Sequence, residues 1–203
     1  YTLSLHDALP ISYGLYVLDA TQVTSPLKNR VSDFDGDKKT DFSVYTPSNG
    51  NWKIQRSTDN VTYDYQFGIN TDELVSGDYD GDDKSDIAVW RPSTGVWYIV
   101  NSSNGGVQFI QWGVQGDIPI ADDFDADGKT DIAVWRPSNG IWYIQRSTQG
   151  LLYRQWGTNG DIPLTGDFEG DGKADIAVWR PVQGTGSSMI DGVWYISKSS
   201  SSE

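Results

Sequence analysis

Four short stretches of the sequence carry acidic residues in the pattern DxDxDxKxD, with a glutamate at position 3 of the last copy. Carboxylates spaced in this way in a tight loop direct their oxygens toward one point, and Ca²⁺ takes roughly six to eight oxygen ligands, backbone carbonyls included. We therefore predict up to four calcium sites, each built from the carboxylates at positions 1, 3, 5 and 9 and the carbonyl of the lysine at position 7. The predicted ligands are Asp33, Asp35, Asp37, Lys39, Asp41; Asp78, Asp80, Asp82, Lys84, Asp86; Asp123, Asp125, Asp127, Lys129, Asp131; and Asp167, Glu169, Asp171, Lys173, Asp175.

Other interpretations of these loops fit less well. Mg²⁺ dehydrates reluctantly and prefers few carboxylates with several waters, and an EF-hand needs flanking helices and a glutamate at position 12. Position 12 is valine in all four loops: Val44, Val89, Val134 and Val178. One acidic loop alone could equally be a solvated turn. Four in register favour a metal, because closely packed carboxylates repel one another without a cation.

The four loops differ at position 6, where we expect a left-handed backbone. Gly128 and Gly172 adopt that conformation easily, whereas the equivalent residues are Asp83 in the second loop and Lys38 in the first. A non-glycine residue there costs on the order of 1 kcal/mol, and Lys38 adds a positive charge near the cation. We therefore predict that the first loop binds calcium most weakly.

The composition of the 203-residue chain excludes several classes of protein. It has no cysteine and one histidine, so disulfides, thiolate zinc sites and cysteine nucleophiles are excluded. Its formal net charge of −13 argues against nucleic acid and anionic membranes, which need a basic face. No apolar run approaches the ~20 residues of a membrane span, so we expect no membrane insertion. With the carboxylates assigned to metal and no other acid–base pair evident, we expect no enzymatic activity.

The first twelve residues resemble the in-frame translation of a short-read sequencing adapter. This stretch, YTLSLHDALPIS, lacks a basic region followed by a continuous apolar run, so it does not read as a signal peptide. It contains the single histidine, His6, to which we assign no function. We interpret residues 1–12 as an artefact and expect that a signal peptide has been lost from a truncated N-terminus.

The acidic loops recur every 45, 45 and 44 residues, and each precedes a copy of DIAVWRP or its weaker form DFSVYTP. The predicted organisation is the artefact at 1–12, an N-terminal strand at 13–32, and repeats at 33–77, 78–122, 123–166 and 167–203. The strand at 13–32 is expected to complete the last repeat, which lacks its own third strand, in the same chain or in a neighbour. Pairing within the chain would close a ring, and pairing with a neighbour would give a head-to-tail polymer.

Each repeat reads as short strands joined by turns. The apolar run after the acidic loop is one strand, a Pro-Ser-Asn-Gly-type turn leads to a WYI strand, and a third strand such as Leu151–Trp156 follows. A Gly-Asp-Ile-Pro connection then leads to the next loop, and no window has helical periodicity. Three to four short strands every ~45 residues predict an all-β fold, either a small β-propeller or a propeller-like or β-solenoid array.

The nine tryptophans and three arginines recur with the repeat. Repeated aromatics mostly carry packing, so we interpret the tryptophans as filler between stacked sheets, with platforms for sugar rings as the alternative. We interpret Arg91, Arg136 and Arg180 as structural partners of the acidic loops. An insertion at about Val182 to Asp191 reads either as a recognition loop or as plain drift.

The acidic loops followed by DIAVW strands resemble the FG-GAP or VCBS repeats of integrin α-subunit propellers and of many bacterial secreted proteins. The resemblance covers essentially all of residues 13–203. It implies a propeller whose loops bind Ca²⁺ between strands of a blade and which serves adhesion, ligand binding or scaffolding. Integrin-type propellers usually have seven blades, whereas this chain has four repeats.

These observations favour a non-catalytic, extracellular or cell-surface calcium-binding β-repeat module with a structural or adhesive role. One alternative is the subunit of an extracellular filament that self-associates through its N- and C-terminal strands. A second is a lectin-like propeller that binds a glycan through exposed tryptophans. A surface protein is the other class of ligand that the resemblance implies.

Overall fold

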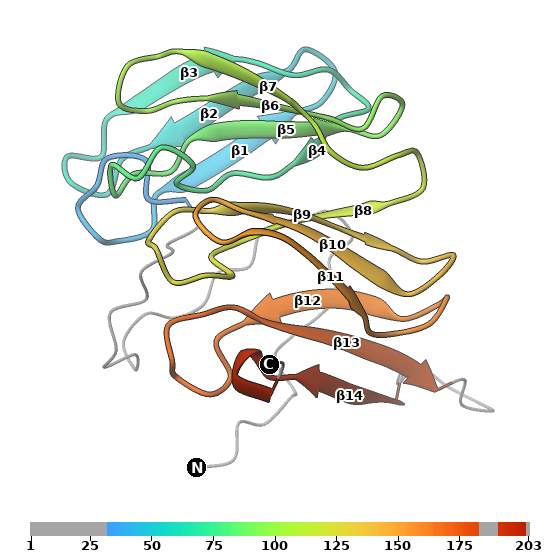
Figure 1. The fold of residues 1–203 in the computed structure, drawn as a ribbon. Coiled ribbons are helices and arrows are strands. Elements are labelled where there is room, and N and C mark those ends of the chain that lie inside the picture. The colour runs from blue at the N-terminus through green and yellow to red at the C-terminus, as the bar shows by residue number, and fades with distance from the viewer. Residues whose placement is uncertain (1–31, 183–190, 202–203) are drawn as a thin grey trace.

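The computed structural model describes residues 32–182 and 191–201, and within them the fold is all-β, as predicted. Its strands form four antiparallel sheets, none closed into a barrel, and the described residues contain one short 3-10 turn, η2 (Ser199–Ser201) (Figure 1). Several predictions fall outside these residues: the artefact at 1–12, residues 13–31 of the predicted N-terminal strand, and residues 183–190 of the insertion.

The four sheets follow one another along the chain. The first contains β1 (Phe42–Thr46), β2 (Asn51–Gln55) and β3 (Thr62–Gln66), and the second contains β4 (Glu73–Leu74), β5 (Ile87–Arg91), β6 (Val96–Val100) and β7 (Val107–Gln111). The third contains β8 (Ile118–Asp122), β9 (Asp131–Arg136), β10 (Ile141–Arg146) and β11 (Gly150–Gln155). The fourth contains β12 (Ile162–Gly166), β13 (Asp175–Val182) and β14 (Asp191–Ser197). Within each sheet, neighbours in sequence are neighbours in space.

The Gly-Asp-Ile-Pro segment is a strand, not only a connection. In the third sheet β8 pairs with β9 from Ile118 opposite Trp135 to Asp122 opposite Asp131. Pro119 is tolerated because β8 is an edge strand, where a missing N–H removes no ladder bond. The acidic loop is therefore the connection of a β-hairpin, held at both ends by paired strands.

Glycine is required in the turns that join β1 to β2, β5 to β6 and β9 to β10. Gly140 has a φ of +68°, and a Cβ added there would lie 2.2 Å from the backbone oxygen of Gly157. A Cβ added at Gly95 would likewise lie 2.2 Å from the backbone oxygen of Gly113. The glycine of the Pro-Ser-Asn-Gly turn thus permits the close approach that keeps each hairpin in register.

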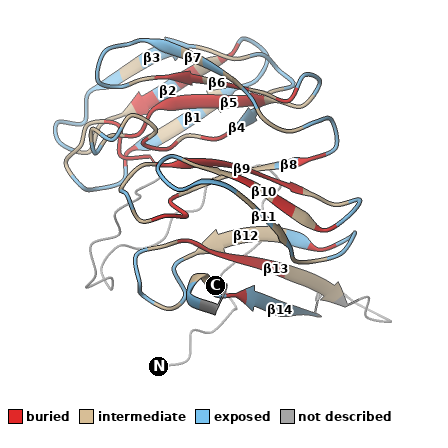
Figure 2. Ribbon diagram, in the orientation of Figure 1, coloured by how far each residue is buried: buried red, intermediate tan, exposed pale blue. Residues whose placement is uncertain are grey.

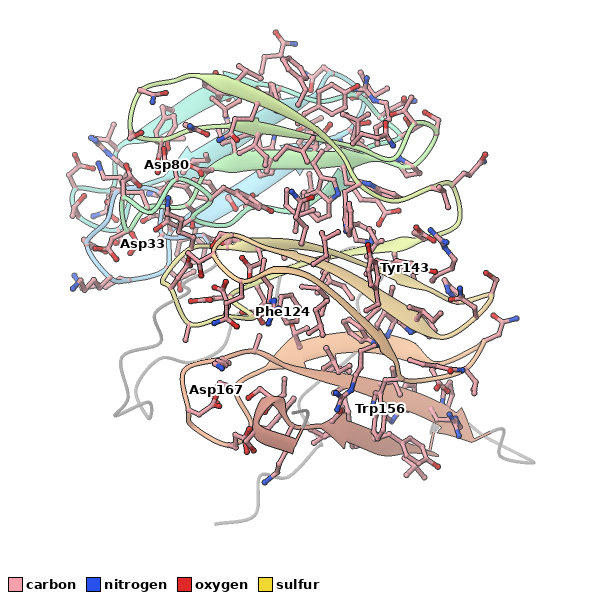
Figure 3. All side chains as sticks on the ribbon, in the orientation of Figure 1. Asp33, Asp80, Phe124, Tyr143, Trp156 and Asp167 are labelled. Carbon is pink, nitrogen blue, oxygen red and sulfur yellow. The ribbon has the colours of Figure 1, made fainter. Side chains whose placement is uncertain are left out.

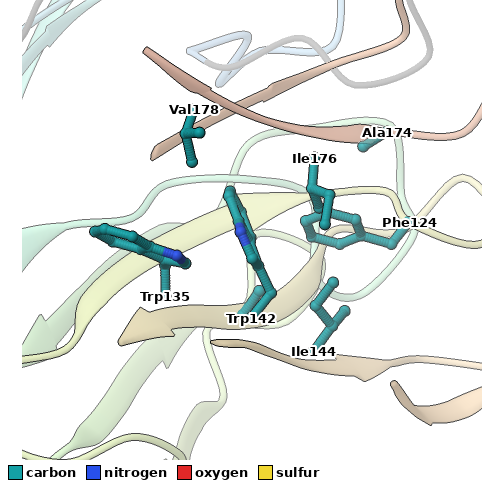
Figure 4. Close-up of a cluster of buried hydrophobic side chains, with 8 residues drawn as sticks. Phe124, Trp135, Trp142, Ile144, Ala174, Ile176 and Val178 are labelled. Atoms are coloured by element: carbon teal, nitrogen blue, oxygen red, sulfur yellow. The ribbon is translucent and has the colours of Figure 1, made fainter. Parts of the chain in front are cut away.

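The sheets stack face to face over three clusters of buried side chains (Figure 1). Between the third and fourth sheets, Trp135 and Trp142 are fully buried against Ile176 and Val178 of the next sheet (Figure 4). The other two clusters repeat this arrangement around Trp90 and Trp97, and around Trp52. Figure 2 shows the buried residues concentrated on the central strands of the stack. For these five tryptophans the interpretation as core filler is confirmed.

The predicted role of the repeated arginines is wrong in one respect, the identity of their partners. Arg91, Arg136 and Arg180 bind Asp72, Asp117 and Asp161, at 2.7–2.8 Å, and not the acidic loops. Each aspartate immediately precedes the first strand of its sheet, β4, β8 or β12, and the pairing of that strand with the next brings it beside the arginine. Each guanidinium also lies over a tyrosine ring, 4.4–4.5 Å from its centroid.

Candidate metal centre

Three of the four acidic loops gather aspartate oxygens within 4.8 Å of one another. The groups are Asp33, Asp35 and Asp37; Asp78, Asp80 and Asp86; and Asp123, Asp125 and Asp127. The loops lie along one side of the stack, where Figure 3 labels Asp33, Asp80 and Asp167. The predicted positions 1, 3 and 5 therefore converge in the first and third loops, and positions 1, 3 and 9 in the second.

The aspartate at position 1 organises the loop backbone. In the third loop, Asp123 Oδ1 accepts a hydrogen bond from the Ala126 N–H at 2.7 Å, and Oδ2 accepts one from the Gly128 N–H at 2.8 Å. Asp33 accepts the same pair of bonds from Gly36 and Lys38. The carboxylate thus folds the loop around itself and fixes the direction of the following side chains.

The expected left-handed backbone occurs at position 6, with φ of 68° at Lys38, 65° at Asp83, 90° at Gly128 and 87° at Gly172. A second left-handed residue lies at position 4, which sequence reasoning missed. Ala126 has a φ of 62° there. The signal was present in the sequence, because the other three loops have glycine at position 4.

The aspartate at position 3 has a buried oxygen whose surroundings indicate a cation site. Asp125 is 5% exposed, and its Oδ2 accepts hydrogen bonds from the Thr148 N–H at 3.0 Å and the Thr148 hydroxyl at 2.7 Å. Its Oδ1 is buried and has no hydrogen-bond partner. The same is true of Oδ1 of Asp80 in the second loop. A buried carboxylate oxygen without a partner is costly unless an ion satisfies it. The donor set is therefore suited to a hard divalent cation.

The hydroxyl residues that orient position 3 were not predicted. Thr58, Ser103 and Thr148 donate to Asp35, Asp80 and Asp125, in each case 23 residues further along the chain. They lie just after β2, β6 and β10, in the recurring segments RST, NSS and RST. That repetition was the available signal. Its meaning depends on a contact between loop and hairpin that spacing alone does not reveal.

The aspartate at position 9 ties the loop to the same hairpin. Asp131 Oδ2 accepts from the Phe124 N–H at 2.9 Å and Oδ1 from the Ser147 N–H at 2.7 Å. Burial, with the charges of Asp125 and Asp123, raises the pKa of Asp131 to about 7 despite these bonds. Burial likewise raises the pKa of Asp86 to about 6. The positive charge of a bound cation would oppose both shifts.

The fourth loop is arranged differently. Both carboxylate oxygens of Glu169 are engaged: Oε1 accepts from the Ser200 N–H at 2.9 Å, and Oε2 from the Ser200 hydroxyl at 2.6 Å. Asp167 is exposed, whereas Asp33, Asp78 and Asp123 are buried. Among the described residues, the fourth loop forms no group of three converging carboxylates.

Neighbouring loops are linked through their backbones. The carbonyl of Asp123 accepts a hydrogen bond of 2.7 Å from the Ala174 N–H in the next loop, and Asp78 and Asp33 accept equivalent bonds from Thr130 and Ser85. In each case position 8 of one loop donates to position 1 of the loop before it. The candidate sites thus form a connected row.

The fold and the loops define a class of β-repeat protein: stacked antiparallel sheets in which an acidic hairpin joins the first two strands. Residues 123–178 match the model of a family described as FG-GAP-like repeat, from the first aspartate of the third loop to Val178 of β13. The chain thus carries an FG-GAP-like repeat over these residues, which confirms the resemblance to FG-GAP repeats, while its calcium-binding VCBS part stays a prediction. A search of curated proteins found no match. None of the helical structure in the described residues has the length and apolar character that crossing a membrane requires.

Proposed function

We propose that this chain is a calcium-binding, non-catalytic β-repeat module of the extracellular space with a structural or adhesive role. One observation carries the calcium assignment: the unpartnered, buried Oδ1 of Asp125 beside the converging carboxylates of Asp123 and Asp127. The family match supports the extracellular setting, since FG-GAP-like repeats are typical of secreted and surface proteins.

Two sets of residues would contribute to each site: those that would coordinate the ion, and those that keep the coordinating side chains in place. The oxygens of positions 1, 3 and 5 would hold the ion in the first and third loops, those of positions 1, 3 and 9 in the second, with the carbonyl at position 7 as a further ligand. Calcium, when bound, supplies positive charge that offsets the mutual repulsion of the carboxylates. Thr148 and Ser147 keep Asp125 and Asp131 in place through the hairpin.

Calcium fits this donor set better than magnesium. The loops present mainly carboxylate oxygens in an irregular array, and Ca²⁺ accepts flexible, carboxylate-rich coordination where Mg²⁺ requires an octahedron and retains waters. Sites of the extracellular type bind with Kd of about 10⁻⁴–10⁻³ M, so they fill where calcium is millimolar.

We further infer that the four sheets are blades of a small propeller built from the four repeats. Each four-stranded sheet is a simple meander, its first strand lies at an edge, and the first strands β8 and β12 of consecutive sheets are in contact. This arrangement is typical of blades around an axis.

The test is calcium-dependent stability. Adding calcium to the EDTA-treated full chain should raise Tm by several degrees, and Asp125→Asn should remove much of the gain. Asp64→Asn is the matched control, because it removes one exposed carboxylate outside the loops. An unchanged Tm on adding calcium would refute the proposal.

The glycan-binding alternative has one supporting feature. A hollow of about 340 Å³ between the second and third sheets is lined by Trp112, Arg136, Tyr143 and Tyr153, and Tyr153 is 55% exposed. Loss of glycan-array binding in Tyr153→Ala would support it. The strand-donation alternative concerns the predicted N-terminal strand, of which residues 13–31 lie outside the described residues, and it stays a prediction.

A further inference from the structure

The two end sheets of the stack expose apolar side chains on the faces that point away from it. On the first sheet, Phe42 and Val44 of β1 are each 62% exposed. On the last sheet, Trp194 is 51% exposed, Phe168 46% and Ile196 40%. These residues lie at repeat positions that elsewhere form the core.

Comparison with the internal interfaces shows what each end face would contact. The residues equivalent to Val44 are Val89, Val134 and Val178, all at most 1% exposed, and each packs against the preceding sheet. Those equivalent to Trp194 are Trp52, Trp97 and Trp142, all at most 2% exposed, and each packs against the following sheet. In Figure 4, Val178 and Ile176 of one sheet face Trp142 and Ile144 of the other.

The two ends are therefore the two halves of one interface that the chain already makes three times. The first sheet presents the half that we call the valine half, which consists of Val44 and of Phe42 in place of isoleucine. The last sheet presents the tryptophan half, which consists of Trp194, Ile196 and Phe168. Burying such side chains removes apolar surface from water, which favours a partner that presents the opposite half.

A hydrogen bond supports the same pairing independently. At each internal interface, position 8 of one acidic loop donates to the carbonyl of position 1 in the loop before. At the ends, the Thr40 N–H and the Asp167 carbonyl occupy these two places, and neither has a hydrogen bond within residues 32–182 and 191–201. The unused donor and acceptor lie beside the valine half and the tryptophan half, respectively.

We propose that the first sheet of one copy docks face to face on the last sheet of a second copy, so that the internal interface is repeated between chains. Phe42 and Val44 would pack against Trp194, Ile196 and Phe168 of the other copy, and Thr40 would donate to Asp167. The interface joins two different surfaces, so assembly gives a ring if the rotation closes and an open row if it does not. This docking requires no exchanged strand and does not depend on the calcium proposal.

The test uses light scattering of the full chain after size exclusion, with two charge variants. The unaltered chain should form particles of two or more chains that dissociate on dilution, and Phe42→Asp or Trp194→Asp should each reduce assembly at least tenfold. Leu151→Asp is the matched control, because Leu151 is 53% exposed on β11, away from both end faces. Circular dichroism and Tm establish that each variant is folded.

Mixing the two variants gives the decisive result. A Phe42→Asp copy retains an intact last sheet and a Trp194→Asp copy retains an intact first sheet, so the mixture should form one-to-one pairs and nothing larger. A monomeric unaltered chain, as expected if the end faces are covered within one molecule, would overturn the proposal. So would particles that persist in both variants, as expected for strand donation, or folded variants that fail to pair.

Discussion

The backbone N–H of Ala174 donates a 2.7 Å hydrogen bond to the carbonyl of Asp123, the first residue of the preceding acidic loop. Both residues are buried, and Asp123 also organises its own loop through its carboxylate. The backbone of one candidate site is therefore fixed by the loop before it. Ordering one loop should lower the entropic cost of ordering the next.

We first predict that metal binding in the third loop protects the Ala174 amide in the fourth. In saturating calcium, Asp125→Asn should speed hydrogen exchange at Ala174 by about fivefold or more, the lower end of usual coupling between sites. Asp35→Asn, in the distant first loop, is the control and should leave this amide unchanged. Equal exchange in both variants, measured by NMR, would show that the loops are independent.

The sequence was sufficient to predict the strands that carry a strong local pattern. DIAVW and WYI are β-branched and aromatic, and they form the two central strands of both four-stranded sheets. The recurrence of tryptophan at fixed repeat positions indicated packing, and Trp97 and Trp142 are fully buried. For the candidate site, alternate aspartates were enough to predict convergence at positions 1, 3 and 5 of the first and third loops.

What the sequence did not reveal depends on pairing between segments. Ile118–Asp122 contains proline and aspartate, which indicate a turn, yet it pairs with β9 as an edge strand. That pairing places Asp117 beside Arg136, 19 residues along the chain, where local spacing gives no hint of contact. The engagement of Glu169 by Ser200 similarly depends on where the chain returns after the insertion.

The second prediction concerns backbone strain in the first loop, where Lys38 has a φ of 68°. Lys38→Gly should stabilise the calcium-loaded protein by about 1 kcal/mol, because glycine adopts this conformation without strain. Lys39→Gly, at the next position, removes the same charge without relieving that strain and should not stabilise. Urea unfolding in saturating calcium measures both. Equal effects would mean that charge, not strain, weakens this loop.

The same reasoning ranks the loops. The first loop should bind calcium more weakly than the third, so Asp35→Ala should reduce calcium-dependent Tm less than Asp125→Ala. The opposite order would overturn the ranking.

The third prediction is a pH dependence set by Asp161 and Arg180, whose charged groups lie 2.7 Å apart. Hydrogen bonds from Arg180 hold the pKa of Asp161 below its usual value of 3.8. A carboxyl group whose pKa is lowered by folding stabilises the folded state at pH values above its unfolded pKa. This stabilisation is lost as the pH falls through the pKa of the folded state. Asp161→Asn should therefore reduce the free energy of unfolding by on the order of 1–2 kcal/mol at neutral pH, and the difference should shrink below about pH 4.

The fourth prediction compares two tryptophans at the same repeat position. Trp142 is fully buried between the third and fourth sheets, whereas Trp194 is 51% exposed on the last sheet. Trp142→Ala should lower the free energy of unfolding by about 3–5 kcal/mol, because it leaves a cavity that the stacked sheets cannot fill. Trp194→Ala should cost less than about 1 kcal/mol in a dilute solution of single chains, and more as the concentration rises if copies dock through this face. Denaturant unfolding at two protein concentrations measures both effects, and a concentration-dependent loss confined to Trp194→Ala would separate packing within the chain from packing between chains.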